Sequence, residues 1–204
     1  MKAVVLNSGG FDSIVMINYL YTILGETNLH SLHFLYGAKN EQQQLRCVEK
    51  VCDKLAIPNK VIKLPAIDWT SGNFFDKDNK GDYDNYLEYR NLIFLSYAIS
   101  YAESIGAEKV YIALLNQQNF PDTTIEFLRG INSFTESLSD ITVDAPFIFD
   151  NKYRLGHIAK YLGIGESDYF SCDYPNFLNE PCGKCPDCIA LQNIQNKILK
   201  PIDL

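Results

Sequence analysis

Short apolar runs alternate along the chain with longer segments in which apolar residues recur every three or four positions. A short apolar run bounded by turn residues predicts a strand, whereas the three-to-four spacing predicts an amphipathic helix. The apolar runs predict strands at residues 2–6, 29–35, 60–64 and 108–115. The periodic segments predict helices at residues 13–24, 41–56, 91–105, 123–138, 152–162 and 188–199.

This order of elements predicts an α/β fold. Strands that alternate with helices form a mainly parallel sheet, and the helices cover both of its faces in a doubly wound arrangement. Residues 68–86 interrupt the pattern with glycines, aspartates and aromatic residues. This segment is too long for a plain connection, so we interpret it as a functional loop. We expect one α/β domain over residues 1–165, with residues 166–204 as a C-terminal segment packed on it.

Composition narrows the class of protein. The chain has 204 residues, of which 47% are hydrophobic and 21% charged, as in an ordinary globular protein with a core. The net charge of −7 argues against a nucleic-acid partner, because phosphate binding needs clustered Lys and Arg. No apolar run reaches the roughly 20 residues that span a bilayer, and no signal-peptide pattern follows Met1. We therefore expect a cytoplasmic protein without a membrane partner.

A glycine-rich turn joins the first predicted strand to the first predicted helix, and it reads Ser8-Gly9-Gly10-Phe11-Asp12-Ser13. Such a turn brings backbone N–H groups close to a phosphate, and the N-terminus of the following helix favours negative charge. Ser8 and Ser13 offer hydroxyl groups, and Asp12 suits either a Mg²⁺ ion or a helix cap. The turn is neither a Walker A loop nor a Gly-x-Gly-x-x-Gly loop. We expect it to bind phosphate; a plain strand-to-helix turn is the alternative.

Four cysteines gather near the C-terminus, at Cys172, Cys182, Cys185 and Cys188. In a reducing cytosol such a cluster favours a metal site over disulfides. Four thiolates suit a tetrahedral, closed structural zinc site. An iron–sulfur cluster and four unligated buried thiols are the alternatives.

The glycine-rich turn resembles the Ser-Gly-Gly-x-Asp-Ser loop of the N-type ATP pyrophosphatases, the PP-loop superfamily. Together with the four cysteines, it makes the chain resemble the 7-cyano-7-deazaguanine synthase family, often called QueC or ExsB. Further similar segments are Tyr89–Ala98 with Tyr101–Ala107, Phe120-Pro121-Asp122 with Glu126-Phe127, and Asn151-Lys152 ahead of Leu162-Gly163-Ile164. The resemblance implies an adenine nucleotide alpha hydrolase-like fold with a small four-cysteine zinc knuckle, in which residues 1–165 bind ATP.

The resemblance also implies an activity. Enzymes of this family are ATP-dependent ligases that form C–N bonds and release AMP and pyrophosphate. They adenylate the carboxylate of 7-carboxy-7-deazaguanine and capture it with ammonia to give the amide. A second activation converts the amide to the nitrile, an intermediate of queuosine biosynthesis. ATP, Mg²⁺ and structural Zn²⁺ are implied as cofactors, and a homodimer as the assembly.

Residue roles follow from the matching segments. The resemblance implies catalytic roles for Asp12, Arg90 and Lys152, and ATP binding by residues 8–13. The implied substrate-binding residues are Arg90, Asn91, Phe120, Pro121, Asp122 and Lys152. Their chemistry fits: the cations can stabilise phosphate charge, a carboxylate can accept the N–H groups of a guanine-like ring, and an aromatic ring can stack on it. The alternatives are helix-terminal charges for Arg90 and Asp122 and a surface lysine for Lys152.

The chain departs from the family in two loops. Leu35-Tyr36-Gly37-Ala38-Lys39-Asn40 stands where the family has Asp-Tyr-Gly-Gln-Arg-His, and Asn116-Gln117-Gln118-Asn119 lacks the family's acidic residue. An intact phosphate loop beside an altered pocket leaves a second hypothesis, a diverged paralogue that joins the deazaguanine acid to another amine or to a protein. Relatives among bacterial defence genes make that role plausible. A third hypothesis, of another class, is a non-catalytic ATP- or purine-binding protein. A tRNA-thiolating relative shares the loop, but the acidic charge argues against it.

Overall fold

The computed structural model describes residues 1–65, 87–115 and 120–199, and within these ranges five parallel strands form one sheet. The strands are β1 (Ala3–Leu6), β2 (Leu29–Leu35), β3 (Asn59–Lys63), β4 (Lys109–Tyr111) and β5 (Thr142–Asp144). Their order in the sheet is β3-β2-β1-β4-β5. The chain thus builds outward from β1 in one direction and then in the other. Ligands of such sheets bind beyond the carboxyl ends of the strands, at the point where the direction reverses, which here lies between β1 and β4.

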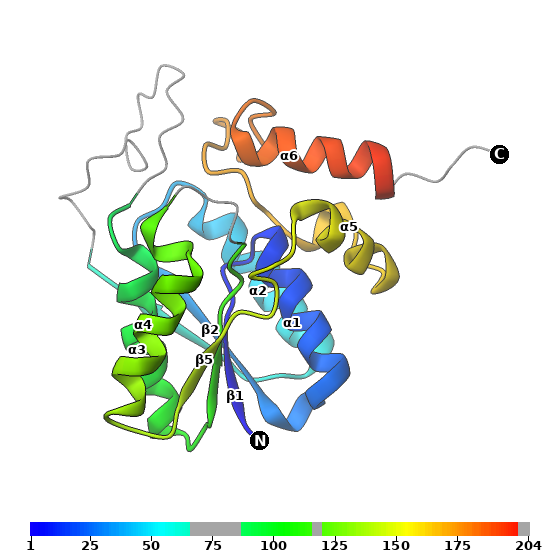
Figure 1. Cartoon of the computed structure of the whole chain (residues 1–204). Helices are drawn as coiled ribbons and strands as arrows, with labels where there is room; N and C mark the ends of the chain where they lie inside the picture. Colours follow the sequence, from blue (N-terminus) through cyan, green and yellow to red (C-terminus); the bar gives the residue numbers. More distant parts are fainter. Residues whose placement is uncertain (66–86, 116–119, 200–204) are drawn as a thin grey trace.

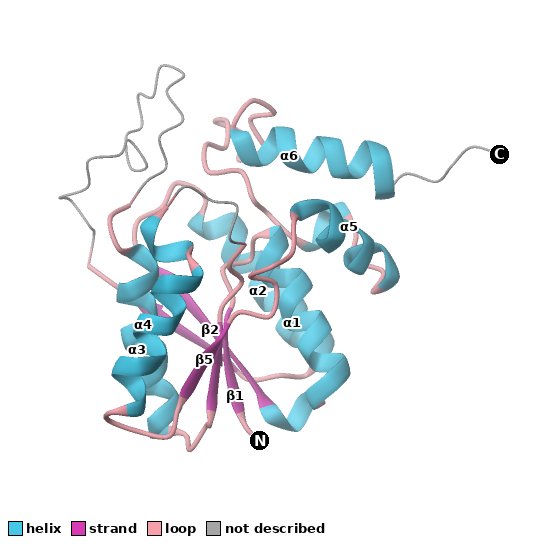
Figure 2. Cartoon of the chain, in the orientation of Figure 1, coloured by secondary structure: helices cyan, strands magenta, loops and turns pink. Residues whose placement is uncertain are grey.

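Helices cover both faces of this sheet, as Figure 2 shows. The helices are α1 (Phe11–Leu24), α2 (Glu41–Leu55), α3 (Arg90–Ser104), α4 (Ile125–Glu136), α5 (Lys152–Tyr161) and α6 (Pro186–Ile194). A π-helical turn, Gln195–Leu199, follows α6, and short 3₁₀ turns lie at Glu26–Asn28, Pro121–Thr123 and Glu166–Asp168. In Figure 1, α1 and α2 lie on one side of the strands and α3 and α4 on the other. The predicted α/β, doubly wound architecture is confirmed.

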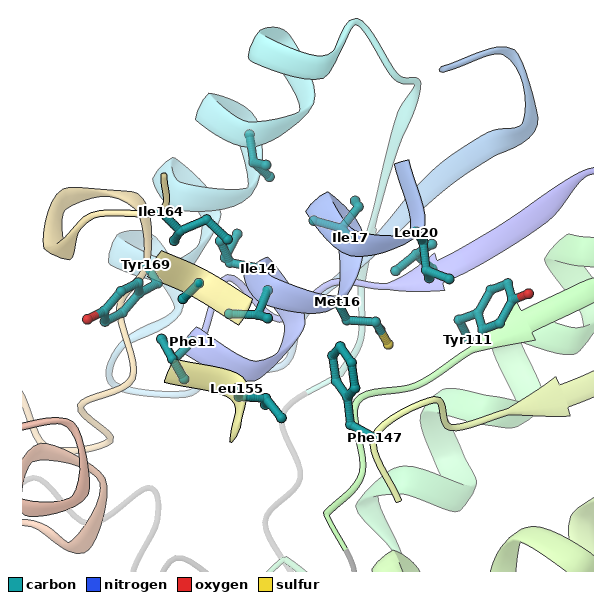
Figure 3. Close-up of a cluster of buried hydrophobic side chains, with 14 of the residues drawn as sticks. Phe11, Ile14, Met16, Ile17, Leu20, Tyr111, Phe147, Leu155, Ile164 and Tyr169 are labelled. Carbon is teal, nitrogen blue, oxygen red and sulfur yellow. The ribbon is translucent and has the colours of Figure 1, made fainter. Parts of the chain in front are cut away.

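Alternate residues of β1 explain why both faces are covered. Ala3 and Val5 are fully buried in a core with α1, α2 and α5, whereas Val4 and Leu6 belong to a second core with α3 and α4. A parallel strand buried on both faces is a continuous apolar run, as this one is. Figure 3 shows side chains of α1 packed in the first core; the labelled ones are Phe11, Ile14, Met16, Ile17 and Leu20. The start of α1 is therefore anchored in the interior.

The C-terminal helix packs on α5 at a glycine. A Cβ atom at Gly156 would lie 2.7 Å from Cγ2 of Ile194, closer than real Cβ atoms come to a neighbour. Ile194 and Ile198 are buried in the same core as α1. The absence of a side chain at Gly156 thus lets the end of α6 and the following turn sit directly on α5, which fixes how the two helices lie together.

Three predictions of elements need correction. The sequence pattern missed β5, which is only three residues long and follows Ser139-Asp140 rather than an apolar run. The predicted strand at 108–115 is shorter, because β4 ends at Tyr111; one further bond to β5 follows it, from the Ile112 N–H to the Asp144 oxygen. The last helix begins at Pro186, two residues before its predicted start, since proline fits the first turn of a helix. The predicted functional loop at 68–86 and the residues 116–119 lie outside the described residues.

Over the described ranges, no helix combines the length and the apolar character that crossing a lipid bilayer requires.

Candidate functional site

The glycine-rich turn after β1 is held in a backbone conformation that requires glycine. Gly9 has φ +79°, and a Cβ atom there would collide with the backbone carbonyl of Gln44 in α2. The side-chain oxygen of Asn7 accepts a hydrogen bond from the Gly9 N–H at 3.2 Å. The Ser8 hydroxyl accepts one from the Gly10 N–H at 3.3 Å. Gly10 is the residue before α1 and has no side chain to cap the helix, so the first N–H groups of α1 lie beside the turn.

The two serines of the turn contact each other, and the turn's own groups fix its shape. Ser8 and Ser13 share a hydrogen bond of 3.0 Å between their hydroxyl oxygens. The Ser13 hydroxyl also donates to the backbone oxygen of Gly10 at 3.0 Å. Asp12 lies within the first turn of α1 and does not cap it, which excludes the helix-cap alternative for this residue. Phe11 points into the core against Tyr169, so it offers the site only its backbone.

A segment 160 residues further along the chain closes over this turn. The Phe11 N–H donates to the Ser171 hydroxyl at 2.8 Å, and the Phe170 N–H donates to the Gly9 oxygen at 2.9 Å. The Gln44 side chain donates to the Phe170 oxygen at 3.3 Å. The residues just before the first clustered cysteine are thus part of the same structure as the glycine-rich turn.

Lys152, the first residue of α5, reaches the turn from the side. Its ammonium nitrogen lies 2.9 Å from Oδ2 of Asp12 and 3.3 Å from Oδ1 of Asp187. Burial alone would lower the pKa of Lys152, but the Asp12 and Asp187 carboxylates raise the pKa above its ordinary value. The side chain therefore stays protonated at neutral pH. The structure brings together Asp12 and Lys152, two of the residues with predicted catalytic roles, and the surface-lysine alternative does not describe Lys152, whose side chain is 21% exposed.

Asp12 has an oxygen to spare. Its Oδ1 is buried and has no hydrogen-bond partner among the residues that the structure describes. A buried carboxylate oxygen without a partner costs free energy unless something occupies it. Magnesium prefers carboxylate oxygens together with substrate phosphates. The position of Asp12, in the first turn of α1, therefore fits a magnesium ion.

A second group of predicted residues meets at the start of α3. The backbone N–H of Asn91 donates to Oδ2 of Asp122 at 2.9 Å, and the Asn91 side chain donates to the Asp122 backbone oxygen at 3.0 Å. Asp122 is buried in the 3₁₀ turn Pro121–Thr123, and Phe120 before it is half-buried. The helix-terminal role considered for Asp122 is therefore real: its carboxylate caps α3.

Arg90 belongs to this group, and its guanidinium lies near Tyr36, Asp173 and Asp122. Burial alone would lower the pKa of Arg90, but Tyr36, Asp173 and Asp122 together raise the pKa above its ordinary value. The Tyr36 hydroxyl is also a hydrogen-bond partner of the guanidinium. Asp173 in turn accepts a hydrogen bond from the Asn40 side chain at 3.2 Å. The loop after β2, the start of α3 and the cysteine segment thus converge on Arg90.

The four predicted metal ligands lie together. The sulfur atoms of Cys172, Cys182, Cys185 and Cys188 all lie within 4.8 Å of one another. The backbone N–H of Cys182 donates to the Cys172 sulfur at 3.2 Å, and that of Cys185 donates to the Cys182 sulfur at 3.3 Å. Hydrogen bonding between the two thiols lowers the pKa of Cys185 and raises that of Cys172, so Cys185 loses its proton first. A close set of four sulfurs, with N–H donors that favour thiolates, fits a tetrahedral metal ion.

Sequence reasoning missed three residues of this arrangement. Ser171, Asp173 and Asp187 each lie within one residue of a clustered cysteine. An acidic residue beside a cysteine looks like a spacer between metal ligands. Nothing in the sequence indicates that Asp187 faces Lys152, because 35 residues separate them. Lys39, in the loop that departs from the family, lies with its ammonium 5.0 Å from the centre of the Tyr174 ring.

The chain is similar over most of its length to known proteins of one family. The family model described as "Queuosine biosynthesis protein QueC" matches residues 2–197. A 7-cyano-7-deazaguanine synthase of Methanobrevibacter smithii is 30% identical, over 92% of this chain and 90% of that protein. One of Rickettsia bellii is 26% identical, over 99% of this chain and 97% of that protein.

Two solved structures share the fold at low identity. The U34-tRNA thiolase NcsA from Methanococcus maripaludis, solved with its [4Fe-4S] cluster, is 14% identical with a TM-score of 0.58. The alignment covers 99% of this chain and 74% of that one. The NMN synthetase from Francisella tularensis is 14% identical with a TM-score of 0.53, covering 99% of this chain and 79% of that one.

Proposed function

Since the chain belongs to the family of the queuosine biosynthesis protein QueC, we propose that it is an ATP-dependent 7-cyano-7-deazaguanine synthase. The observation that carries the proposal is the contact of Lys152 with Asp12, at 2.9 Å, in the first turn of α1. A protonated lysine and a carboxylate whose second oxygen has no partner among the described residues, beside a helix N-terminus, support the binding of a nucleotide's phosphates there.

The reaction we propose has two activations. In the first, a carboxylate oxygen of 7-carboxy-7-deazaguanine attacks the α-phosphorus of ATP, and pyrophosphate leaves. Ammonia then attacks the acyl carbon, AMP leaves and the amide forms. In the second, the amide oxygen attacks the α-phosphorus of another ATP and pyrophosphate leaves; loss of AMP and of both N–H protons of the amide then gives the nitrile.

The residues of the turn bind and orient the nucleotide in this proposal. The Gly9 conformation brings the backbone of the turn close to the phosphates, and the first turn of α1 adds N–H donors. Asp12 would hold Mg²⁺, whose charge offsets that of the phosphates. Lys152 stays protonated and stabilises the charge that develops on the α-phosphate.

The group at the start of α3 binds the second substrate. Arg90 carries a lasting positive charge and pairs with the substrate carboxylate, which it can meet with two parallel N–H bonds. One lone pair of the Asp122 carboxylate accepts from the Asn91 N–H, and another accepts an N–H of the ring. Phe120 and Pro121 border the same turn and present an apolar surface to a flat heterocycle.

We propose zinc for the four-cysteine site. Three of its ligands, Cys172, Cys185 and Cys188, are buried, as in a closed structural site. In this role the ion holds the C-terminal segment together and takes no part in the chemistry. Elemental analysis of protein purified without chelators tests this. One zinc per chain supports the assignment, and iron with acid-labile sulfide overturns it.

The activity is tested with purified protein, Mg-ATP, 7-carboxy-7-deazaguanine and ammonium, with AMP and purine products read by mass spectrometry. A product of nitrile mass, formed with two AMP, supports the proposal. An amide alone overturns the second activation and leaves the first. Asp12→Asn keeps the size of the side chain but removes its charge, so it should abolish AMP release. Equal AMP release by this variant would overturn the role of Asp12.

A second acceptor is favoured by one observation. In the loop that departs from the family, Asn40 stands where the family has histidine, and its side chain donates to Asp173, which faces Arg90, so the departure touches the proposed carboxylate site. The same adenylate could then pass to another amine or to a protein amine. AMP release that needs the deazaguanine acid but not ammonium would favour this function. The homodimer implied by the family is tested by light scattering on the purified chain.

A further inference from the structure

Lys152 is held by two carboxylates, and only one of them belongs to the phosphate-binding turn. Asp12 lies in the first turn of α1, and Asp187 lies in the first turn of α6. The side chains of Asp12, Lys152 and Asp187 are 18%, 21% and 30% exposed. Such partly buried charges are screened less than the fully exposed pairs whose contribution is small. The contact of Asp187 with Lys152 is therefore a fixed part of the site rather than a surface ion pair.

The backbone of Asp187 is fixed on both sides. It lies between Cys185 and Cys188, whose sulfurs belong to the four-cysteine cluster. The other end of α6 is fixed by its direct packing on α5, where Ile194 contacts Gly156. Lys152 is the first residue of α5, and Asp187 lies in α6. The close packing of these two helices at Gly156 therefore limits how far the ammonium and the carboxylate can move relative to each other. The carboxylate is thus presented to the ammonium by a rigid support.

The formal charges of Asp12, Lys152 and Asp187 explain what Asp187 contributes to the site. One ammonium and one carboxylate would neutralise each other, and Lys152 would then be drawn fully onto Asp12. With Asp187 present the three groups carry a formal charge of −1, and Asp12 keeps an oxygen without a partner among the described residues. That oxygen is the one that fits a magnesium ion.

We propose that Asp187 is a positioning residue for Lys152. It holds the ammonium at the edge of the phosphate site and shares it with Asp12, so that Asp12 stays available to a cation. This inference rests on the proposed function for the role of Lys152, but the contact itself does not. Asp173 is a second acidic residue beside the cluster. It follows Cys172 and faces Arg90, so it too brings a carboxylate of the cysteine segment to a cation of the site.

Asp187→Asn tests the proposal, because asparagine keeps the shape and one acceptor oxygen but removes the charge. We expect kcat for AMP release to fall about tenfold, since a small displacement of a catalytic group has effects of this size or larger. The KM for ATP should change less than threefold. Metal content and the thermal midpoint should stay at wild-type values. Asp187→Glu should recover part of kcat.

Asp150→Asn is the matched control. Asp150 also pairs with a cation of α5, with 2.7 Å between its Oδ1 and Nε of Arg154, but this pair does not include Lys152. Its kcat should match that of the wild type. An unchanged kcat in Asp187→Asn overturns the proposal. So does a loss of activity in proportion to lost metal, because Asp187 would then only support the cluster.

A second readout needs no turnover. An amine-acylating reagent, with labelled peptides read by mass spectrometry, reports how freely each lysine reacts. Asp187→Asn should raise the labelling rate of Lys152 severalfold relative to that of Lys160 on the same helix. An unchanged ratio overturns the proposal. If the wild type releases no AMP from the deazaguanine acid, the proposed function fails, yet this ratio still decides whether Asp187 holds Lys152.

Discussion

The carboxylate of Asp122 caps a helix that begins 32 residues before it. Its Oδ2 accepts a hydrogen bond of 2.9 Å from the backbone N–H of Asn91, the second residue of α3. Tyr89, which precedes the helix, has φ +51° and offers no side-chain cap of its own. The N-terminal amides of a helix otherwise lack partners, so the turn at Pro121–Thr123 completes α3 from outside. Arg90, the first residue of α3, is therefore placed by Asp122.

Substitution of Asp122 should separate the cap from the substrate contact. Asp122→Ala removes the acceptor and leaves a buried N–H without a partner, which should lower the free energy of unfolding by about 1–2 kcal/mol. Asp122→Asn keeps an acceptor and should cost less than half of that, yet it loses the carboxylate that we assign to the ring. Urea unfolding and AMP release measure the two effects. Asp140→Ala, at an exposed position, is the control. Wild-type stability in Asp122→Ala would contradict the cap.

Gly9→Ala should damage the phosphate turn more than a comparable glycine substitution elsewhere. Gly163 also has a positive φ, +68°, but nothing lies within 4 Å of its missing Cβ. Gly163→Ala should therefore cost only the left-handed conformation, about 1–2 kcal/mol. Gly9→Ala adds a collision with the backbone of Gln44. It should lower the thermal midpoint further and weaken binding of a non-hydrolysable ATP analogue at least tenfold in calorimetry. Equal effects of the two substitutions would contradict this.

The fold could be predicted where the pattern is local and strong. The helix at 41–56 was predicted within one residue of Glu41–Leu55, because its apolar residues keep one face. The short strand β5 could not, because three residues carry no periodicity and its pairing with β4 is a long-range contact. The strand predicted at 108–115 is too long, because Ile112, Leu114 and Leu115 are buried like strand residues although β4 ends at Tyr111; the Ile112 N–H still donates to the Asp144 oxygen.

The residues of the site, like the elements of the fold, could be predicted from the sequence only where their pattern is local. The glycine-rich turn and the four cysteines are local patterns, and the sequence predicts which residues gather. The sequence does not predict which acid meets which cation. Asp12 lies 140 residues from Lys152 along the chain, and Asp187 lies 35 residues from it, so only the fold decides that both face one ammonium. The structure brings Asp122 to Asn91, but the role of Asp122 toward a substrate stays a prediction.

Cys185→Ser should release the bound metal and loosen the C-terminal segment. Structural zinc sites in small domains bind with apparent free energies of about 10–16 kcal/mol, which matches or exceeds the stability of a typical domain. Elemental analysis should find less than one metal ion per ten chains. Limited proteolysis should cut between residues 170 and 190, where the wild type resists. Cys47→Ser, a half-buried position on α2 outside the cluster, is the control. Full metal content in Cys185→Ser would contradict the assignment of this ligand.

Stability should fall as the pH drops below 6.5, because of His33. This side chain is 2% exposed, and burial lowers its pKa below the ordinary value of 6.5, against the opposing effects of the Asn7 backbone, Glu41 and Glu49. Its Nδ1 donates to the Asn7 oxygen at 2.8 Å, and its Nε2 is buried without a partner among the described residues.

Between the folded and unfolded pKa values, the unfolded chain therefore binds a proton that the folded chain does not. The stabilisation is complete above pH 6.5 and is lost toward the folded pKa of His33, at no more than about 1.4 kcal/mol per pH unit. Urea unfolding at pH 7.5 and pH 5.5 measures the difference. His33→Gln should be less stable at pH 7.5 but should lose less on acidification than the wild type. His157→Gln, at an exposed position on α5, should keep the wild-type difference. Equal losses in the wild type and His33→Gln would show that other groups set the acid limit of this protein.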